Sequence, residues 1–287
     1  MFTLVSDERL NPTAGFRARR LAVYPVERGF ESVWFPEHTH VPASRETPFP
    51  GGGELPREYI DMLDPLTSCA AAAVVTEKLV VGTAVCLINE HDIFALANAV
   101  ASVDVLAKGR FEFGVGAGWI AEEMVNHGFQ FEERWAVLED RLQALKSLWT
   151  QDESTYHGKF INFEKVWSYP KPIQKPHPPI ILGTLASKWG RKRTAAYADG
   201  WIPLSSVHGD SLVKDIHDFH EQLLAVGRDP KDVPVSICDN QEIPFDKIRE
   251  LADLGLVYRA IPRCPTEDRE SVLRWMDGYA KLIDELK

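Results

Sequence analysis

The stretch LVVGTAVCLINEHDIFALANAVASVDVLAKGRFEFGVG, residues 79–116, contains two short apolar runs with a longer segment between them. The runs at 79–85 and 111–116 are rich in β-branched and aromatic residues and have the length of buried parallel strands. The segment between them is long enough to form a helix. The stretch therefore predicts a strand–helix–strand unit, the repeating element of parallel α/β folds.

The same alternation continues along the rest of the chain. Further short apolar runs lie at 2–5, 32–35, 179–183, 200–204, 233–238 and 256–261. Helical spacing marks the segments between them, as in 134–149 with Leu138 and Leu142, and the last segment follows Thr266, a predicted N-cap. Eight strands, each followed by a helix, predict a single (β/α)8 TIM barrel over residues 1–287. The alternative is an open doubly wound sheet, which usually stops at about five or six strands.

Two stretches interrupt this rhythm. Residues 39–63 hold four prolines and three consecutive glycines, and they predict a long loop after the second strand. Residues 155–179 predict a β-hairpin and a proline-rich lead, an insertion before the fifth strand. Because the active sites of such barrels are built from loops that follow strands, we expect the long loop to border the site.

Composition excludes several classes of function. The formal net charge is −10, whereas proteins that bind nucleic acid need a surplus of Lys and Arg. The chain has no apolar run of about 18 residues to span a bilayer, and its first residues lack the features of a signal peptide. Its cysteines, Cys69, Cys86, Cys238 and Cys264, lie far apart, as is typical of reduced thiols rather than of a metal site. We expect a cytoplasmic protein without a metal ion and without nucleic-acid or membrane partners.

Two candidate sites follow predicted strands in the first half of the chain. Glu37 and His38 come directly after 32–35, where barrel enzymes keep acids and bases. The alternative for His38 is a structural role at the strand end. The glycine-rich turn 114–119 lets a planar or anionic ligand approach the backbone, although such a turn is also found at tight barrel corners.

A third candidate follows the run at 179–183. Gly183 and Thr184 lead to Ser187, a predicted N-cap, and to the basic segment 188–193, in which we expect Arg191 to contact an anion. The alternative is a solvated basic helix face, which is how most charge runs are used. The acidity of the whole chain makes this cationic cluster unusual and favours a phosphate site.

Several longer stretches, read together, resemble the luciferase-like monooxygenase superfamily, and more closely its actinobacterial branch of F420-dependent oxidoreductases. They occur in family order between about residues 20 and 204. The stretches are ERGFESVWFPEHTHVP, DPLTSCAAAAVVTEKLVVGTAV, LANAVASVDVLAKGRFEFGVGAGW, LQALKSLWT with YHGKFINF, PKPIQKPHPPIILG, and RTAAYADGWIPL.

The resemblance implies coenzyme F420 as the cofactor, with FMN as the alternative. It implies a non-prolyl cis peptide bond at Ala84–Val85 that supports the cofactor ring from behind. It places Glu37 and His38 at the ring and the reaction centre, with His38 as the candidate acid or base. The other implied cofactor contacts come from the glycine turn and from the loop after the fifth strand: Ala117, Gly118, Trp119, Gly183 and Thr184.

The resemblance also implies a reaction, hydride transfer between the deazaflavin and a small organic substrate, in a protein that forms a homodimer. Trp119 stands where the sugar-phosphate dehydrogenases of this superfamily have a glutamate. It cannot transfer a proton, and it favours an apolar or aromatic substrate. Two alternatives remain open: an FMN-dependent monooxygenase, and a cofactor-binding protein without turnover.

Overall fold

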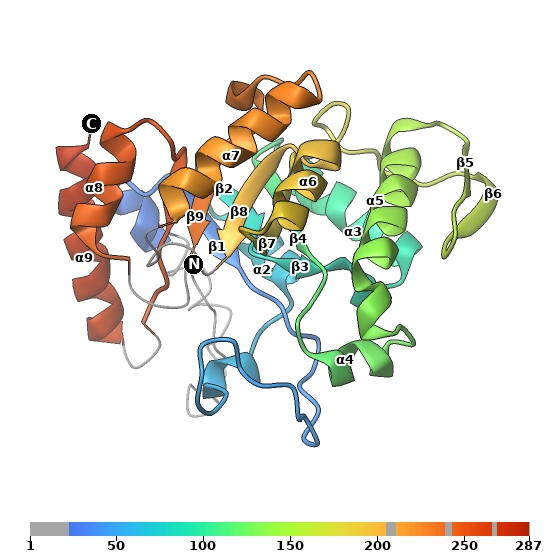
Figure 1. Ribbon diagram of the computed structural model, residues 1–287, viewed down its shortest axis with the longest axis horizontal. Helices are drawn as coiled ribbons and strands as arrows, with labels where there is room; N and C mark the ends of the chain where they lie inside the picture. The colour runs from blue at the N-terminus through green and yellow to red at the C-terminus, as the bar shows by residue number, and fades with distance from the viewer. Residues whose placement is uncertain (1–22, 205–210, 239–242, 266–268, 287) are drawn as a thin grey trace.

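The computed structural model describes residues 23–204, 211–238, 243–265 and 269–286 (Figure 1). The strands are β1 (Ser32–Phe35), β2 (Val80–Thr83), β3 (Cys86–Leu87), β4 (Phe111–Gly116), β5 (Ser154–His157), β6 (Asn162–Val166), β7 (Ile180–Leu185), β8 (Gly200–Leu204), β9 (Ser236–Cys238) and β10 (Arg259–Ile261). The α-helices are α2 (Pro65–Val74), α3 (Ile93–Leu106), α4 (Ala121–Asn126), α5 (Arg134–Thr150), α6 (Lys188–Tyr197), α7 (Leu212–Ala225), α8 (Phe245–Asp253) and α9 (Arg269–Glu285). Short 3-10 turns include η1 (Arg57–Tyr59) and η2 (Ile88–Glu90).

The central sheet is parallel, and its strands lie in chain order. The order is β1-β2-β4-β7-β8, with β3 continuing the line of β2 beside β4. A parallel bridge between Trp201 and Val235 links β8 to the segment leading into β9, and β9 pairs with β10. A doubly wound sheet would reverse its strand order at a switch point, whereas a barrel adds each strand beside the previous one. The described strands follow the order of a barrel.

The inward faces of these strands meet in one apolar cluster. Its members come from six strands or strand ends around the sheet: Trp34, Ala84, Ile181, Ile202, Cys238 and Ile261. At the other end of the strands, the buried Arg259 of β10 donates to Glu112 of β4 and to Glu31 beside β1. Contacts between strands so far apart in the sheet require strong curvature. The fold is an α/β fold with a curved parallel sheet, which confirms the predicted class; among the described strands, no pairing of β10 with β1 closes the predicted (β/α)8 barrel.

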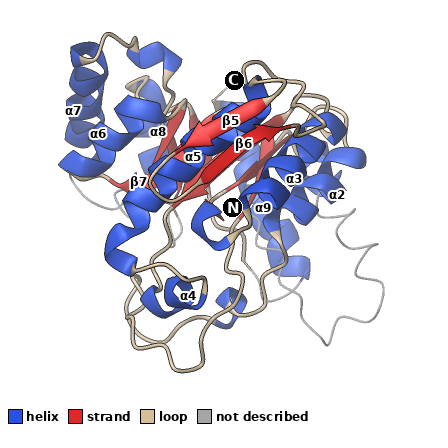
Figure 2. Cartoon of the chain, turned by 90° about the vertical axis from the view of Figure 1, so that its right-hand side faces the viewer, coloured by secondary structure: helices blue, strands red, loops and turns tan. Residues whose placement is uncertain are grey.

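The helices are stabilised by N-caps at their first turns and by apolar faces that pack against the sheet. Asp64 accepts a hydrogen bond from the amide of Thr67 at the start of α2, and Asp92 caps α3 in the same way through the amides of Phe94 and Ala95. Most buried residues of α2, α3 and α5 join a single core cluster with the outer faces of β1, β2 and β4. Figure 2 shows the helices around the outside of the strands.

Most of the predicted elements are present with nearly the predicted bounds. The runs at 32–35, 111–116 and 200–204 coincide with β1, β4 and β8. The helix predicted at 134–149 is α5. The predicted first strand at 2–5 and the predicted N-cap Thr266 lie outside the described residues.

The polypeptide between β1 and α2 has no strand and only the 3-10 turn η1. It lies at the same end of the molecule as α4, which follows β4 (Figure 1). Both segments follow the carboxyl ends of parallel strands, so they lie at the same edge of the sheet. The antiparallel pair β5–β6 precedes β7 and packs beside α5. Within the described segments, no helix has the length and apolar character needed to cross a membrane.

The strands β2 and β4 approach each other closely at Gly114. A Cβ atom at this position would lie 1.7 Å from the carbonyl oxygen of Thr83, a backbone atom that cannot move aside. We therefore expect Gly114→Ala to lower the free energy of unfolding by at least about 2 kcal/mol, because the added carbon forces two paired strands apart. Urea denaturation measures the change.

The control is Gly278→Ala in α9, where a Cβ atom would lie an ordinary 3.6 Å from the ring of Phe245. Alanine in a helix interior is more stable than glycine by roughly 0.5–1 kcal/mol, so this variant should be unchanged or slightly stabilised. A Gly114→Ala protein as stable as the wild type would contradict the described approach of β2 and β4.

Candidate active site

A cavity of about 340 Å³ opens at the carboxyl ends of the strands. Its floor is built from small residues of β2, β4 and β7, among them Ala84, Gly116 and Gly183. The peptide bond Ala84–Val85 is cis, as predicted. Val85 lies between the two glycines, since a Cβ atom would come within 2.4 Å of its side chain from Gly116 and within 2.7 Å from Gly183. The two glycines thus make room for the side chain of Val85, which packs over them and gives this part of the floor an apolar surface.

Aromatic side chains form the opposite side of the cavity. Phe49 and Tyr59 come from the loop between β1 and α2, and Trp119 follows β4. The three rings contact one another with centroids 5.2 to 6.3 Å apart. Burial raises the pKa of Tyr59 to about 12, with a smaller contribution from Cys238, so its hydroxyl stays protonated. This side of the cavity offers an apolar, aromatic surface with few polar groups.

His38 lies between this aromatic group and a buried carboxylate. Its Nδ1 is 2.7 Å from Oε2 of Glu123 in α4, and both side chains are almost fully buried. The indole N–H of Trp119 donates to the other ring nitrogen, Nε2, over 3.2 Å. Nε2 therefore holds a lone pair, and the proton of neutral His38 is on Nδ1, where it is donated to Glu123. The imidazole is oriented as in sites where a carboxylate fixes the tautomer of a general base.

A second buried carboxyl group lies next to Glu123. Burial raises the pKa of Glu90 to about 9, and the negative charges of Glu123 and Glu37 act in the same direction. Glu123 has the opposite shift: burial alone would raise its pKa, but the hydrogen bonds from His38 and from the amide of His40 lower it below the usual value. Glu90 is therefore a neutral acid at pH 7 beside the charged Glu123.

Thr39 joins these carboxyl groups to the surface. Its hydroxyl is 3.2 Å from Oε2 of Glu90, 3.5 Å from Oε1 of Glu123 and 2.9 Å from Nε2 of His127. The side chain of His127 is 25% exposed. Burial lowers the pKa of His127, and the nearby His40 lowers it further, so the imidazole is neutral at pH 7. A continuous line of polar groups runs from the cavity to solvent.

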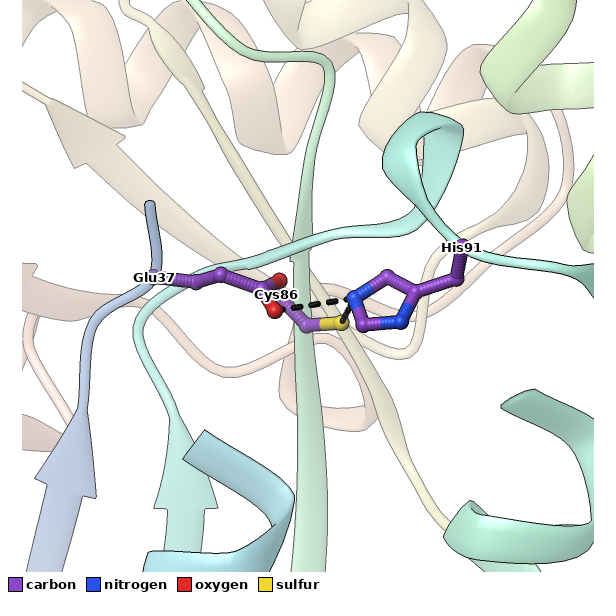
Figure 3. Close-up of side chains that lie close together, drawn as sticks. All are labelled: Glu37, Cys86 and His91. Atoms are coloured by element: carbon purple, nitrogen blue, oxygen red, sulfur yellow. Dashed lines mark hydrogen bonds and ion pairs between the residues drawn. The ribbon is translucent and has the colours of Figure 1, made fainter. Parts of the chain in front are cut away.

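Glu37 belongs to a different group, which Figure 3 shows together with Cys86 and His91. Its carboxylate accepts a hydrogen bond from the amide of Leu87 over 2.6 Å and lies 2.8 Å from Nε2 of His91. Glu37 therefore positions the segment after β2, because its carboxylate binds the backbone immediately beyond the cis bond. Glu37 also lines the cavity, so both expected residues of the pair reach the site.

Cys86 completes a group with Glu37 and His91 whose ligand atoms lie within 4.8 Å of one another (Figure 3). The thiol is 3.7 Å from the same His91 nitrogen that contacts Glu37. Burial raises the pKa of Cys86 well above its usual value, and the Glu37 carboxylate adds to the shift. A neutral, buried thiol is a poor nucleophile. The three side chains are joined through Nε2 of His91, which lies 2.8 Å from Glu37 and 3.7 Å from Cys86.

Arginine side chains lie at the edge of the cavity. Arg134 and Trp135 of α5 line it. The guanidinium of Arg193, from α6, lies 4.7 Å from the centre of the Trp135 ring. Burial lowers the pKa of Arg134, and the charge of Arg193 lowers it further, which indicates two close cations. This part of the edge is positively charged in a chain whose formal net charge is −10.

Most of the residues predicted for the site line this cavity, and Arg191 does not. Ala84, Val85, Ala117, Gly118, Trp119, Gly183 and Thr184 do so. The hydroxyl of Thr184 is used inside the protein, where it donates to the carbonyl of Leu185 and accepts from Trp201. Arg191 instead forms ion pairs with Asp215 and Asp218 of α7. The prediction that Arg191 contacts an anion at this site conflicts with those ion pairs, because α6 presents Arg191 to α7.

Sequence reasoning missed Glu123, Glu90 and Thr39. They belong to three segments that lie together only in the folded chain. Carboxylates are common in polar loops and short helices, so the sequence offers no signal that marks Glu90 or Glu123 as part of a site. The predicted N-cap Ser187 is confirmed, because its hydroxyl accepts the amide hydrogen of Gly190 at the start of α6.

Comparison with known proteins gives matches over most of the chain. A family model described as luciferase-like monooxygenase matches residues 4–238. An uncharacterized protein of Mycobacterium tuberculosis is 39% identical over 255 residues, which are 88% of this chain and 86% of that protein. The F420-dependent glucose-6-phosphate dehydrogenase of Amycolatopsis mediterranei is 28% identical over 284 residues, 94% of this chain and 78% of that enzyme.

A solved structure has a similar fold. The crystal structure of monooxygenase RslO1 from Streptomyces bottropensis aligns with a TM-score of 0.79 and 19% identity, over 99% of this chain and 97% of that one. At this identity the likeness shows the fold alone. It supports the assignment of the curved parallel sheet to the barrel class.

The protonated Glu90 makes stability depend on pH. Its pKa of about 9 in the folded protein exceeds the usual 4.5, so the folded state keeps a proton that the unfolded chain releases. This contribution is fully present below pH 4.5 and is lost as the pH rises to 9. We expect the free energy of unfolding to fall with pH in this window by up to about 1.4 kcal/mol per pH unit. We expect Glu90→Gln, which mimics the neutral acid, to remove that decline in urea denaturation series between pH 5 and 9.

Glu122→Gln, at the position before Glu123 in α4, is the control. Partial burial would raise the pKa of Glu122, but hydrogen bonds from the Thr47 hydroxyl and the amides of Glu46 and Thr47 lower it to about 2. Its contribution is lost only as the pH falls below 4.5, so the slope from pH 5 to 9 should match the wild type. Equal slopes in the Glu90→Gln protein and the wild type would show that Glu90 is ionised in the fold.

Proposed function

This chain belongs to the luciferase-like monooxygenase family, and on that basis we propose that it is an F420-dependent oxidoreductase. In this proposal it exchanges a hydride between the deazaflavin and a small organic substrate. The observation that carries the proposal is the cavity floor, in which Val85 lies between Gly116 and Gly183. An apolar floor on which only Val85 rises over the two glycines leaves room for a ring above it, and a cavity of about 340 Å³ lies within the usual range for a ligand site.

The cofactor tail is the second element of the fit. F420 carries a phosphate and a glutamate tail, both anionic. Arg134 lines the cavity and Arg193 lies beside it, both within 6.0 Å of the ring of Trp135, so two cations lie near this edge. Guanidinium groups bind phosphate and carboxylate through charge-assisted hydrogen bonds. We therefore assign the tail to this edge, a role that was expected for Arg191.

The substrate side of the cavity contains a group that can accept or donate the proton that accompanies hydride transfer. Bound F420 supplies hydride transfer at its ring. His38 presents the lone pair of Nε2 toward the cavity, because Glu123 holds the proton at Nδ1. In the oxidation of an alcohol, Nε2 takes the hydroxyl proton after the substrate replaces the N–H of Trp119. Glu123 then stabilises the imidazolium, as a carboxylate does in other general-base sites.

The aromatic group limits the choice of substrate. Phe49, Tyr59 and Trp119 surround the approach to His38 with apolar ring surfaces. A substrate with an apolar or aromatic body and one carbonyl or hydroxyl group fits this surface. The A. mediterranei relative is by its name specific for a sugar phosphate, and we do not carry that substrate over to this chain. The homodimer implied by the resemblance stays a prediction.

An FMN-dependent monooxygenase is the second candidate function. The family description and the name of RslO1 both specify a monooxygenase. Such an enzyme needs oxygen and reduced flavin. In that case the isoalloxazine ring of FMN would lie on the same cavity floor. The two candidates differ in the cofactor bound and in the need for oxygen.

An anaerobic titration with F420 and with FMN, followed by isothermal calorimetry, tests the proposal. We expect F420 to bind more tightly than FMN, and reduced F420 to be oxidised without oxygen by an apolar enone or ketone. Arg134→Gln and Arg193→Gln should each weaken F420 about ten-fold, since each removes about 1.4 kcal/mol of charge-assisted hydrogen bonding to the tail. Neither should change the affinity for a cofactor fragment that lacks the phosphate and glutamates.

Lys192→Gln is the charge-matched control, because Lys192 is exposed on the same helix and contacts the ring of Trp189. It should leave both affinities unchanged. Tighter binding of FMN together with oxygen-dependent turnover would favour the monooxygenase. Equal weakening of F420 and of the fragment would refute the assignment of the tail to Arg134 and Arg193.

A further inference from the structure

The polar groups behind His38 form an uninterrupted line to the protein surface. The first link is the 2.7 Å contact between Nδ1 of His38 and Glu123. The second leads from Glu123 to the neighbouring Glu90: both carboxyl groups lie within 3.5 Å of the Thr39 hydroxyl, and the buried Oε1 of Glu90 has no hydrogen-bond partner among the described residues. The hydroxyl of Thr39 is 3.2 Å from Glu90 and 2.9 Å from Nε2 of His127. His127 is partly exposed to solvent.

We propose that Glu123, Glu90, Thr39 and His127 form a proton relay that connects His38 in the cavity with solvent. The proposal rests on the proposed function, because a proton must enter or leave His38 whenever a hydride is exchanged with an alcohol or carbonyl. In this relay His38 contacts the reacting atoms of the substrate. The other four residues position His38 and carry its proton to or from solvent.

The transfer is balanced at each step. When an alcohol is oxidised, its carbon gives a hydride to the deazaflavin and its hydroxyl proton goes to Nε2 of His38. The proton on Nδ1 then moves to Glu123, and neutral His38 is restored with its proton on the other nitrogen. Glu123 passes its proton to Glu90 as Glu90 gives its own proton to the hydroxyl of Thr39. Thr39 releases its hydrogen to Nε2 of His127, and water takes the proton from there. Reduction of a carbonyl runs the same line in reverse.

The protonation states in the resting protein suit this direction. Glu90 is a neutral acid, so it has a proton to give, and Glu123 is a carboxylate, so it can accept one. The pKa of His127 is lowered by burial and by His40, so its imidazole is neutral and accepts a proton. Each donor therefore faces an acceptor along the line.

The groups that set these states come from every segment packed around Glu90. They are Glu37, His38, Thr39 and His40 of the segment after β1, His91 after η2, and Glu123 and His127 of α4 and its carboxyl end. Glu37 is held by the amide of Leu87 and by His91 and does not contact the line. A second pair, Glu37 and the partly exposed His91, also reaches from the cavity toward solvent, but it does not include His38.

The first test needs no cofactor. Infrared spectroscopy of the protein alone should show a protonated carboxyl band at pH 7 that titrates away near pH 9 and is missing from Glu90→Gln. A protein without that band at pH 7 would overturn the relay, since Glu90 would have no proton to pass on. Because this readout is made on the free protein, it stands even if the protein binds neither F420 nor FMN.

The second test removes one hydroxyl. Thr39→Val keeps the shape of the side chain, whereas Thr39→Ser keeps the hydroxyl and serves as the matched control. We expect Thr39→Val to lower kcat about ten-fold or more, at unchanged F420 affinity and unchanged KM, with kcat rising again with buffer concentration. Thr39→Ser should retain the wild-type kcat. A Thr39→Val enzyme with wild-type kcat and no response to buffer would overturn the relay.

A third variant covers the case in which Thr39→Val does not fold. His127→Gln breaks the line at its exposed end, and added imidazole should restore turnover by taking its place. The control is His157→Gln, an exposed histidine on β5 that pairs with Glu164. Imidazole should not affect that variant. A His127→Gln enzyme that turns over normally without imidazole would show that the proton leaves by another route.

Discussion

The close approach of β2 and β4 at Thr83 and Gly114 is the contact on which the site depends. The hydroxyl of Thr83 donates to the carbonyl of Gly114 over 2.6 Å, and only a glycine leaves room for the Thr83 carbonyl. This contact fixes the register of β2 against β4 immediately before the cis bond. It sets Val85 over Gly116 and Gly183, and so it determines the floor of the cavity. A side chain at Gly114 would move the floor as well as the sheet.

The polar residues behind the cavity cost stability, and their arrangement limits that cost. Three carboxyl groups, Glu37, Glu90 and Glu123, are buried within one small region. Burying three like charges would be strongly unfavourable. Glu37 is matched by a backbone amide and His91, Glu123 is matched by His38, and Glu90 remains neutral. An apolar core would be simpler to fold, so a network of this kind indicates a function that needs mobile protons.

Periodicity and strand ends were sufficient to predict much of the fold and part of the site. The strands β1, β4 and β8 stand out because buried parallel strands are short and apolar on both faces. Glu37 and His38 were found because they directly follow such a strand. Glu123 and Glu90 were not, because their role depends on burial and on contacts between distant segments, which no local pattern records. The fold also separates two residues that look equivalent in the sequence. Arg191 and Arg193 are two positions apart on one helix and so point to different sides, one toward α7 and the other toward Trp135.

The site is therefore a rigid floor, an aromatic opposite side and a proton-carrying group between them. The rigid part comes from strands and the aromatic part from a long loop, which is the usual division between scaffold and specificity in a barrel. The central claim is that this floor holds the deazaflavin ring of F420. A crystal structure of the protein with F420 bound tests that claim most directly. The account predicts the ring against Val85, between Gly116 and Gly183, with the phosphate near Arg134 and Arg193. Cofactor density elsewhere on the protein, with side chains or solvent filling the floor around Val85, would contradict it.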